Sequence, residues 1–343
     1  MPRQNQTYKL TACNWELTLK CNLNCMHCGS RAGRARANEL NLDECFILVD
    51  ELHELGCKDV TLIGGEVFLF NGWEKVAQRF ADLGILVNVV TNGYRIRMTE
   101  IKQITKVQLV NVGISIDGME ATHNTIRGRA DAFAQVKRTL NLFKQAGITT
   151  GAVTTLMQSN FPDLEELYHF LVEHRVQVWQ LQLVSAMGRM AAKNNCAIKP
   201  RQVGWITDFI REKNKERQIM VIAADSIGYF NDNEAYIRGN SSPICCWDGC
   251  RAGISSVFID SVGNVKGCGA LYSDEFIEGN VRQAPLRNIW NSSSSFSYNR
   301  RFTPDLLSGK CKRCDFGAAC KGGCRSSNYF GSHSLYASTC CCR

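Results

Sequence analysis

Residues 14–30 read NWELTLKCNLNCMHCGS, a β-like run that leads into three closely spaced cysteines. Cys21, Cys25 and Cys28 are separated by three and two residues, and the next cysteine, Cys45, lies inside a helical pattern. Three thiolates on one loop can hold three corners of an iron–sulfur cube, and without a fourth cysteine one iron stays open. An open coordination position is what a metal needs to bind and activate a substrate.

The sequence around this loop alternates between short β-like runs and amphipathic helical patterns. The β-like runs cover 14–19, 59–64, 85–91, 107–116, 148–156 and 176–184, and the helical patterns cover 41–55, 72–83, 98–105, 131–146 and 162–174. Strand–helix alternation six times over predicts an α/β fold with a parallel sheet, open or curled into a partial (β/α)6 barrel. Ligands of such sheets lie at the carboxyl ends of the strands, and the cysteine loop follows the first strand.

The composition changes near residue 245. Eleven of the 18 cysteines lie in the last 99 residues, among glycines and short β-like runs such as SVFID and GNVKGC. A small, loop-rich domain with this many cysteines needs metal ions or clusters to hold it together. We therefore expect a barrel over 1–190, a bridging region over 191–244 with a helix from Pro200, and a cysteine-rich domain over 245–343.

Composition restricts the class of protein. The chain has 343 residues, 45% of them hydrophobic and 21% charged, as in soluble globular proteins. The N-terminus has no apolar signal segment and no run is long enough to span a membrane, so a cytoplasmic protein without membrane contact is expected. A reducing compartment argues against a disulfide scaffold.

The formal net charge of +8 suggests an anionic partner such as nucleic acid. However, three [4Fe–4S] clusters with their thiolates would contribute roughly −5, which leaves about +3. The only dense basic group is RAGRAR, at 31–36. Nucleic acid is therefore not an expected partner.

Three motifs in combination resemble the radical SAM enzymes over about residues 12–190. They are CNLNCMHC at 21–28, GGE at 64–66 after the second strand, and SIDG at 115–118 after the fourth. The resemblance implies a [4Fe–4S] cluster on the cysteine triplet, S-adenosyl-L-methionine (SAM) bound to its open iron, and a 5′-deoxyadenosyl radical that abstracts hydrogen from the substrate. A zinc site that includes His27 is the alternative for the triplet, whereas in the family this position would shield the cluster.

The same resemblance implies a set of cofactor-binding residues: Gly64, Gly65, Glu66, Asn92, Ser115, Asp117, Arg138 and Val184. Glu66 would accept a hydrogen bond from the SAM ammonium, and the glycines before it would let the backbone approach a ligand closely. Ser115 and Asp117 are candidates for the SAM ribose or carboxylate. Arg138 would pair with the carboxylate, unless it is a solvated surface residue, and Val184 would line the adenine site. Val67 stands where the family often has proline.

The spacing of the C-terminal cysteines resembles the SPASM extension of radical SAM enzymes. Cys250 is followed by twelve residues, Gly263, four residues and Cys268, and later by the run Cys311, Cys314, Cys320 and Cys324. The resemblance implies two auxiliary [4Fe–4S] clusters, and thus three clusters in all. The first would use Cys250, Cys268, Cys324 and either Cys245 or Cys246, and the second Cys311, Cys314, Cys320 and one of Cys340, Cys341 and Cys342. Two zinc ribbons are the alternative.

The remaining cysteines, Cys13, Cys45, Cys57 and Cys196, are expected to be structural, with a hydrogen-atom donor among them or among the spare C-terminal thiols as the alternative.

SPASM enzymes mostly act on peptides or proteins, so the resemblance implies a maturase of a ribosomally made precursor peptide that forms a crosslink or another backbone or side-chain modification. An external electron donor is implied as a partner. Only twenty residues precede Cys21, so we expect a separate small leader-binding protein, a RiPP recognition element, or direct recognition through 185–245.

Two other functions stay open at this point. The first is an anaerobic sulfatase-type formylglycine maturase, in which an aspartate follows the position of Cys268, whereas this chain has Gly269. The second is a non-catalytic iron–sulfur electron carrier, which would need no SAM site. His123 and Arg127, downstream of SIDG, are candidates for substrate contacts or for a structural role.

Overall fold

The computed structural model describes residues 7–192, 196–224, 226–238 and 247–337. The strands are β1 (Ala12–Glu16), β2 (Asp59–Ile63), β3 (Leu86–Thr91), β4 (Leu109–Ser115), β5 (Thr150–Leu156), β6 (Val178–Leu183), β7 (Met220–Ala223), β8 (Ser256–Ile259), β9 (Asn264–Lys266) and β10 (Gly279–Asn280). The helices are α1 (Leu42–Glu54), α2 (Trp73–Asp82), α3 (Met98–Ile104), α4 (Glu120–Arg127), α5 (Ala132–Ala146), α6 (Leu164–Glu173), α7 (Pro200–Glu216), α8 (Glu234–Ile237), α9 (Leu286–Asn291), α10 (Ser297–Arg300), α11 (Gly317–Cys320) and α12 (Arg325–Ser332).

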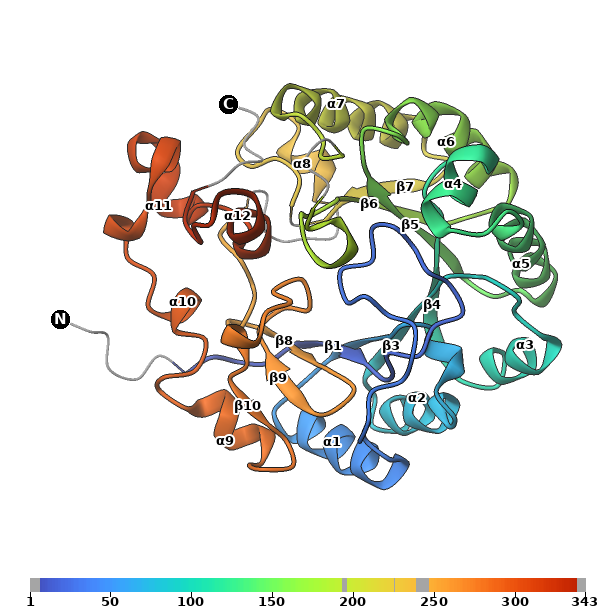
Figure 1. Cartoon of the computed structure of the whole chain (residues 1–343), viewed down its shortest axis with the longest axis horizontal. Coiled ribbons are helices and arrows are strands. Elements are labelled where there is room, and N and C mark those ends of the chain that lie inside the picture. Colours follow the sequence, from blue (N-terminus) through green and yellow to red (C-terminus); the bar gives the residue numbers. More distant parts are fainter. Residues whose placement is uncertain (1–6, 193–195, 225, 239–246, 338–343) are drawn as a thin grey trace.

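All described strands belong to one sheet with the order β10-β9-β8-β1-β2-β3-β4-β5-β6-β7. The neighbours from β1 to β7 pair in parallel, as predicted for the first six. Figure 1 shows the sheet as a curve, with α1 to α7 on its outer side and the loop after β1 on its inner side. Right-handed strand–helix units place helices on a parallel sheet in this way.

The sheet continues across both expected domain boundaries. Met220 of β7 pairs with Val178 of β6, and Ser256 of β8 pairs in parallel with Ala12 of β1. The bridging region and the cysteine-rich region therefore each add strands to the barrel sheet. The expected division at 190 and 245 stays a prediction.

The helices form where apolar periodicity and end signals agree. α1 begins with a capping box, in which the Asn41 side chain accepts from the Glu44 amide and the Glu44 side chain accepts from the Asn41 amide. α2 turns its buried residues toward the sheet, where Phe80 contacts the buried ring of Trp15 edge to face at 6.1 Å between centroids. Among the described helices, none has the length and apolar character needed to cross a bilayer.

Candidate functional site

The cysteine triplet lies on the loop that follows β1, on the inner side of the curved sheet (Figure 1). Cys25 is buried with Leu23 and Tyr94, and Cys21 and Cys28 pack against this small cluster. The loop is closed by backbone hydrogen bonds around Gly33, such as the 2.9 Å bond from the Cys21 amide to the Gly33 carbonyl. The fold thus brings the three predicted ligands together.

Each of the three sulfur atoms accepts a hydrogen bond from a nitrogen donor. The bonds run from the Leu23 amide to Cys21 Sγ (3.5 Å), from Asn92 Nδ2 to Cys21 Sγ (3.7 Å), from Arg127 Nη1 to Cys25 Sγ (3.7 Å) and from the Ala32 amide to Cys28 Sγ (3.3 Å). Donors of this kind stabilise thiolates and tune the potential of a bound iron–sulfur cluster.

Burial determines the protonation of the thiols. Burial raises the pKa of Cys21 to about 11 and raises the pKa of Cys25 above its ordinary value. These thiols are therefore protonated at neutral pH and become thiolates when a metal displaces the protons. In the described part of the chain, no three His, Cys, Asp or Glu side chains are grouped as ligands of a single metal ion. The shared packing of the three cysteines and the nitrogen donors to each sulfur suit the predicted [4Fe–4S] site, and the choice between a cluster and zinc stays a prediction.

The glycines of the GGE motif are required by the cysteine loop itself. A Cβ atom on Gly64 would lie 2.7 Å from the Thr18 carbonyl oxygen, and one on Gly65 would lie 2.4 Å from that of Lys20. The Gly65 amide donates to the Thr18 carbonyl at 2.6 Å. In this structure the close approach at these glycines is therefore to the chain that leads into Cys21, whereas the sequence suggested an approach to a ligand.

Glu66 is a buried carboxylate beside the loop. Its Oε1 accepts the Thr91 hydroxyl at 2.7 Å and its Oε2 accepts the Asn92 amide at 2.8 Å. Burial, partly offset by these hydrogen bonds, raises the pKa of Glu66 to about 7. Oε1 also accepts the Phe68 amide at 3.4 Å, whereas Oε2 keeps a lone pair for a further donor, as the predicted role of Glu66 toward the SAM ammonium requires.

The other predicted cofactor-binding residues differ in their surroundings. The Ser115 hydroxyl, at the end of β4, has no hydrogen-bond partner among the residues described. Val184, just after β6, packs against the buried cluster of Ile126, Met157 and Met190, as Met26 of the cysteine loop does. Arg138 is exposed on α5 and its Nη1 donates to the Ile96 carbonyl at 2.9 Å. Within the described residues no hydrogen bond joins Arg138 to a cysteine, and its role toward the SAM carboxylate stays a prediction.

Asp117 joins the cysteine loop to α4 through a buried ion-pair network. Its Oδ2 lies 2.7 Å from Arg127 Nη2 and 2.8 Å from His27 Nε2, and its Oδ1 accepts the Thr155 amide at 3.0 Å. Burial opposes ionisation of Asp117, but the charges of Arg127 and His27 outweigh it and hold its pKa well below the usual range. The carboxylate is thus committed to positioning these side chains, and a direct contact with SAM stays a prediction.

His123 supports the same network from α4. Its Nδ1 accepts the Asp117 amide at 3.0 Å, and its Nε2 is buried without a partner. Burial, together with the nearby Arg127 charge, lowers the pKa of His123 to about 3, so its ring is neutral. The contacts of His123 and Arg127 within this network explain both residues without a substrate contact.

The sequence analysis did not identify Arg189, which positions the cysteine loop. Arg189, which lies in a short 3-10 helix after β6, donates to the carbonyls of Cys25 (3.2 Å) and Ala32. Its amide also donates to the Cys28 carbonyl at 3.1 Å. The only local signal for such a role is the sequence GRM at 188–190, which follows a predicted strand.

The described C-terminal cysteines form a second sulfur-rich region. Cys320 and Cys324 are buried with Tyr229 and Trp247, and Cys250 packs against them. Burial raises the pKa of the Tyr298 hydroxyl above its ordinary value, and negative charge on Cys250 and Cys268 would raise it further. Cys250 thus lies beside Cys324, and the assignment of Cys250, Cys268 and Cys324 to one cluster stays a prediction. Cys311 lies in a short 3-10 turn over Gly309–Arg313, which Cys314 ends. The predicted ligands Cys245, Cys246, Cys340, Cys341 and Cys342 lie outside the described residues.

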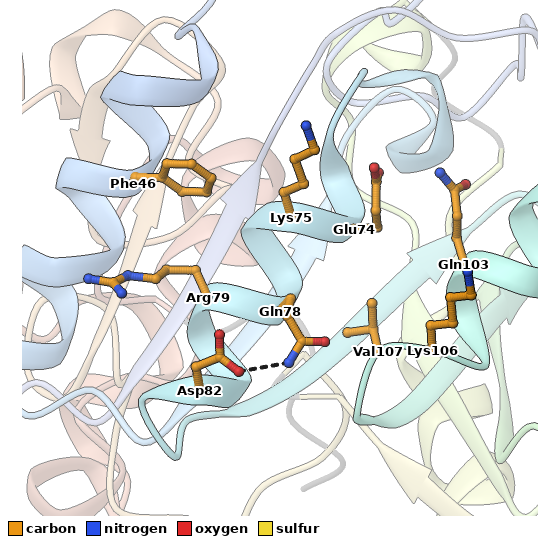
Figure 2. Close-up of a pocket in the computed structure, with 9 residues that line it drawn as sticks. All are labelled: Phe46, Glu74, Lys75, Gln78, Arg79, Asp82, Gln103, Lys106 and Val107. Atoms are coloured by element: carbon orange, nitrogen blue, oxygen red, sulfur yellow. Dashed lines mark hydrogen bonds between the residues drawn. The ribbon is translucent and has the colours of Figure 1, made fainter.

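A surface pocket lies elsewhere, on the outer helices. It has a volume of about 600 Å³ and is lined by residues of α1, α2, α3 and the turn after α3. Figure 2 shows Phe46 and Lys75 at this pocket, and the hydrogen bond from Gln78 to Asp82. None of the predicted site residues lines it, so we do not assign it to the reaction.

Two family models match this chain. The Radical SAM superfamily model matches residues 15–171, and the model of the SPASM iron–sulfur cluster-binding domain matches residues 250–315. The predicted resemblance to a radical SAM enzyme with a SPASM extension is therefore confirmed. Members of this superfamily are enzymes, so the chain is an enzyme, and the electron-carrier alternative is set aside.

Curated relatives include proteins named as heme synthases and proteins named as mycofactocin maturases. The AdoMet-dependent heme synthase of Methanosarcina barkeri is 28% identical over 325 residues, which covers 92% of this chain and 91% of that protein. The mycofactocin maturase MftC of Mycolicibacterium smegmatis is also 28% identical over 325 residues, which covers 92% of this chain and 78% of the maturase.

Solved structures share the fold. Streptococcus suis SuiB bound to S-adenosylmethionine superposes with a TM-score of 0.75 at 16% identity, covering 97% of this chain and 77% of SuiB. The anSMEcpe structure with bound AdoMet superposes with a TM-score of 0.74 at 19% identity, covering 96% of this chain and 93% of anSMEcpe. The predicted fold class is confirmed. The matches support SAM and [4Fe–4S] clusters as cofactors, and the number of three clusters stays a prediction.

Proposed function

We propose that this chain, a radical SAM enzyme with a C-terminal SPASM domain, is a maturase that modifies a ribosomally made precursor peptide. The product would be a crosslink or another change at an unactivated backbone or side-chain carbon. The mycofactocin maturases among its relatives support this proposal, because they align with 92% of this chain.

The observation that carries the proposal is an apolar wall beside the cysteine loop. Met26, Val184 and Cys196 are partly buried there and pack on a buried layer formed by Ile126, Met157 and Met190. Methionine side chains adapt to irregular apolar shapes. Such a wall suits an aliphatic or aromatic side chain of a peptide.

The charges near this wall are already used within the chain. Arg127 pairs with Asp117, and Arg189 binds loop carbonyls. A substrate rich in carboxylates would have to compete for these cations, whereas a peptide side chain would not. This contrast favours the peptide.

The bound cluster and SAM would supply one-electron cleavage of the sulfonium and hydrogen-atom abstraction from the substrate. The role of the chain is to hold and orient these groups. Glu66 would accept the SAM ammonium, and the Ser115 hydroxyl would donate to an oxygen of SAM. Arg127, fixed by Asp117, keeps a hydrogen bond on Cys25. The buried surroundings of Cys25 exclude water from this side of the site.

Two partners belong to the same proposal. An external protein would supply the electron, and a separate small leader-binding protein would present the precursor. Copurification under oxygen-free conditions tests the second partner. Full activity of the isolated chain on the free precursor would remove it.

A second candidate is an enzyme that modifies a tetrapyrrole. It is favoured by the match to the Methanosarcina barkeri heme synthase, which extends over 91% of that relative, a larger share than for the mycofactocin maturase. Both candidates use the same SAM site, and the substrate alone separates them.

The space around Gly269 argues against the formylglycine alternative. A Cβ at this position would lie 2.6 Å from Cε2 of Phe258, whose side chain is buried. The aspartate that the sulfatase-type maturases carry here would therefore not fit without moving the Phe258 ring.

The deciding experiment compares two substrates. The anaerobically reconstituted enzyme would be incubated with SAM and reductant, together with either a precursor peptide encoded beside its gene or an iron porphyrin. Mass spectrometry would follow each substrate and 5′-deoxyadenosine. We expect a mass change in the peptide, with 5′-deoxyadenosine formed in proportion. Turnover of the porphyrin with an unchanged peptide would overturn the proposal in favour of the second candidate.

A further inference from the structure

Arg325 is a fully buried arginine in the cysteine-rich domain. Its side chain is 0% exposed, at the start of α12 and directly after Cys324. Nη1 donates to the carbonyls of Lys321 (2.6 Å), Gly323 (3.4 Å) and Leu335 (3.2 Å). These carbonyls hold the guanidinium in place, but they do not neutralise its charge.

The rest of the guanidinium has no partner. Nε and Nη2 are buried without a hydrogen bond, and no Asp or Glu pairs with Arg325 among the residues that the structure describes. The rings of Tyr336 and Phe302 lie 4.6 and 5.6 Å from Cζ and give only partial compensation. A buried cation without a counter-charge is strongly unfavourable, so the site calls for an anion.

The candidates for that anion are cysteine sulfurs. Cys324 is the neighbour of Arg325 in the chain, and Cys250 packs with Cys324 in the same cluster. Burial lowers the pKa of Arg325, and Cys250, Tyr336, Cys324 and Cys320 are the ionisable groups whose negative charge would raise it. Cys324 is also the N-cap of the eight-residue α12, an end that carries positive partial charge.

We propose that Arg325 is the counter-charge of the auxiliary cluster held by Cys250, Cys268 and Cys324, and that its unpartnered Nε and Nη2 groups face the sulfur atoms of that cluster. Arg325 is then a positioning residue that binds neither SAM nor substrate. A [4Fe–4S] cluster with four thiolates is an anion in both redox states, and reduction adds one more negative charge. A buried guanidinium therefore stabilises the reduced state more than the oxidised state and raises the reduction potential.

The test is a redox titration of the reconstituted holoenzyme followed by electron paramagnetic resonance. Signals that SAM does not alter report the auxiliary clusters. In Arg325→Gln, which removes the charge, we expect the reduced-to-oxidised ratio of one such cluster to fall at least tenfold at a fixed potential, a shift of 59 mV to more negative values for a one-electron couple. Arg325→Lys keeps the charge and should recover most of this shift.

Arg300 provides the matched control. It is half-buried, with Cζ 4.4 to 4.6 Å from the rings of Tyr8, Trp290 and Phe296, and its buried Nη2 has no partner. The groups that act on Arg300 are Tyr8, Glu278 and Tyr298, with no cysteine among them. Arg300→Gln should therefore disturb packing and shift the auxiliary potentials clearly less than Arg325→Gln does.

Three results would overturn the proposal. They are an unchanged potential in Arg325→Gln at full iron content, an equal shift in Arg300→Gln, and equal loss of auxiliary iron in Arg325→Gln and Arg325→Lys. The third result would assign Arg325 a packing role rather than a charge role, whereas loss of iron in Arg325→Gln alone would support the proposal. The proposal rests on the auxiliary cluster and not on the peptide substrate, so an inactive peptide assay would leave the potentials measurable.

Discussion

Replacement of Asp117 by asparagine tests the buried network that joins the cysteine loop to α4. The Asp117 side chain is 0% exposed and its Oδ2 contacts both Arg127 and His27. Asparagine keeps the shape but removes the charge, so the buried Arg127 is left without its counter-ion. Removal of one partner from a buried ion pair costs about 3–5 kcal/mol of unfolding free energy. Asp117→Asn should therefore lower the unfolding midpoint in urea markedly.

The exposed pair Asp50–Arg79 supplies the control. Its Nη2–Oδ1 distance is 2.8 Å, close to that of the buried pair, but its side chains are 47% and 44% exposed. Asp50→Asn should cost at most about 1 kcal/mol, because water screens exposed pairs. Equal midpoints for Asp117→Asn and Asp50→Asn would refute the assigned role of the network.

A double variant separates stability from function. Asp117→Asn combined with Arg127→Met removes both charges and should regain most of the lost stability. It also removes the hydrogen bond to Cys25 Sγ, so formation of 5′-deoxyadenosine should stay low. Recovery of both stability and activity would mean that Arg127 has no role at the cluster.

The remaining predictions concern the two strand ends beside the triplet. Gly65→Ala should lose about one cluster of iron, because its Cβ would meet the Lys20 and Leu19 carbonyls at 2.4 and 2.5 Å, whereas Gly33→Ala, with nothing within 4 Å, should keep its iron. Burial raises the pKa of Glu66 to about 7, and only the ionised carboxylate attracts the SAM ammonium. As the pH increases toward 7, SAM affinity should therefore rise by up to about tenfold per pH unit, and above pH 7 it should level off. Calorimetry can measure this dependence, which Glu66→Gln should remove. Cys25→Ala should abolish 5′-deoxyadenosine formation yet keep most of the C-terminal iron, as metal analysis would show.

Much of the fold could be predicted because local signals were strong. The run DVTLIG predicted a strand over 59–64, and β2 covers Asp59–Ile63. α4 was missed because EATHNTIR is mostly polar and short, and its three buried residues give little apolar periodicity. The parallel pairing of β8 with β1 joins residues more than 240 positions apart, and no local pattern encodes such a contact.

The site shows the same limit. The cysteine spacing and the GGE and SIDG motifs indicated which residues meet at the strand ends. They did not indicate that Asp117 would be held by Arg127 and His27, because that contact needs α4 to be packed over the loop. Nor could the sequence indicate that the motif glycines make room for the backbone before Cys21.

The central claim is that the triplet of Cys21, Cys25 and Cys28 holds a [4Fe–4S] cluster whose open iron binds SAM. The most direct measurement is electron paramagnetic resonance of the reduced enzyme, prepared without oxygen, before and after addition of SAM. We predict one cluster signal that SAM shifts and that the triple Cys→Ala variant lacks. Zinc at this position, or cluster signals that SAM leaves unchanged, would contradict the account.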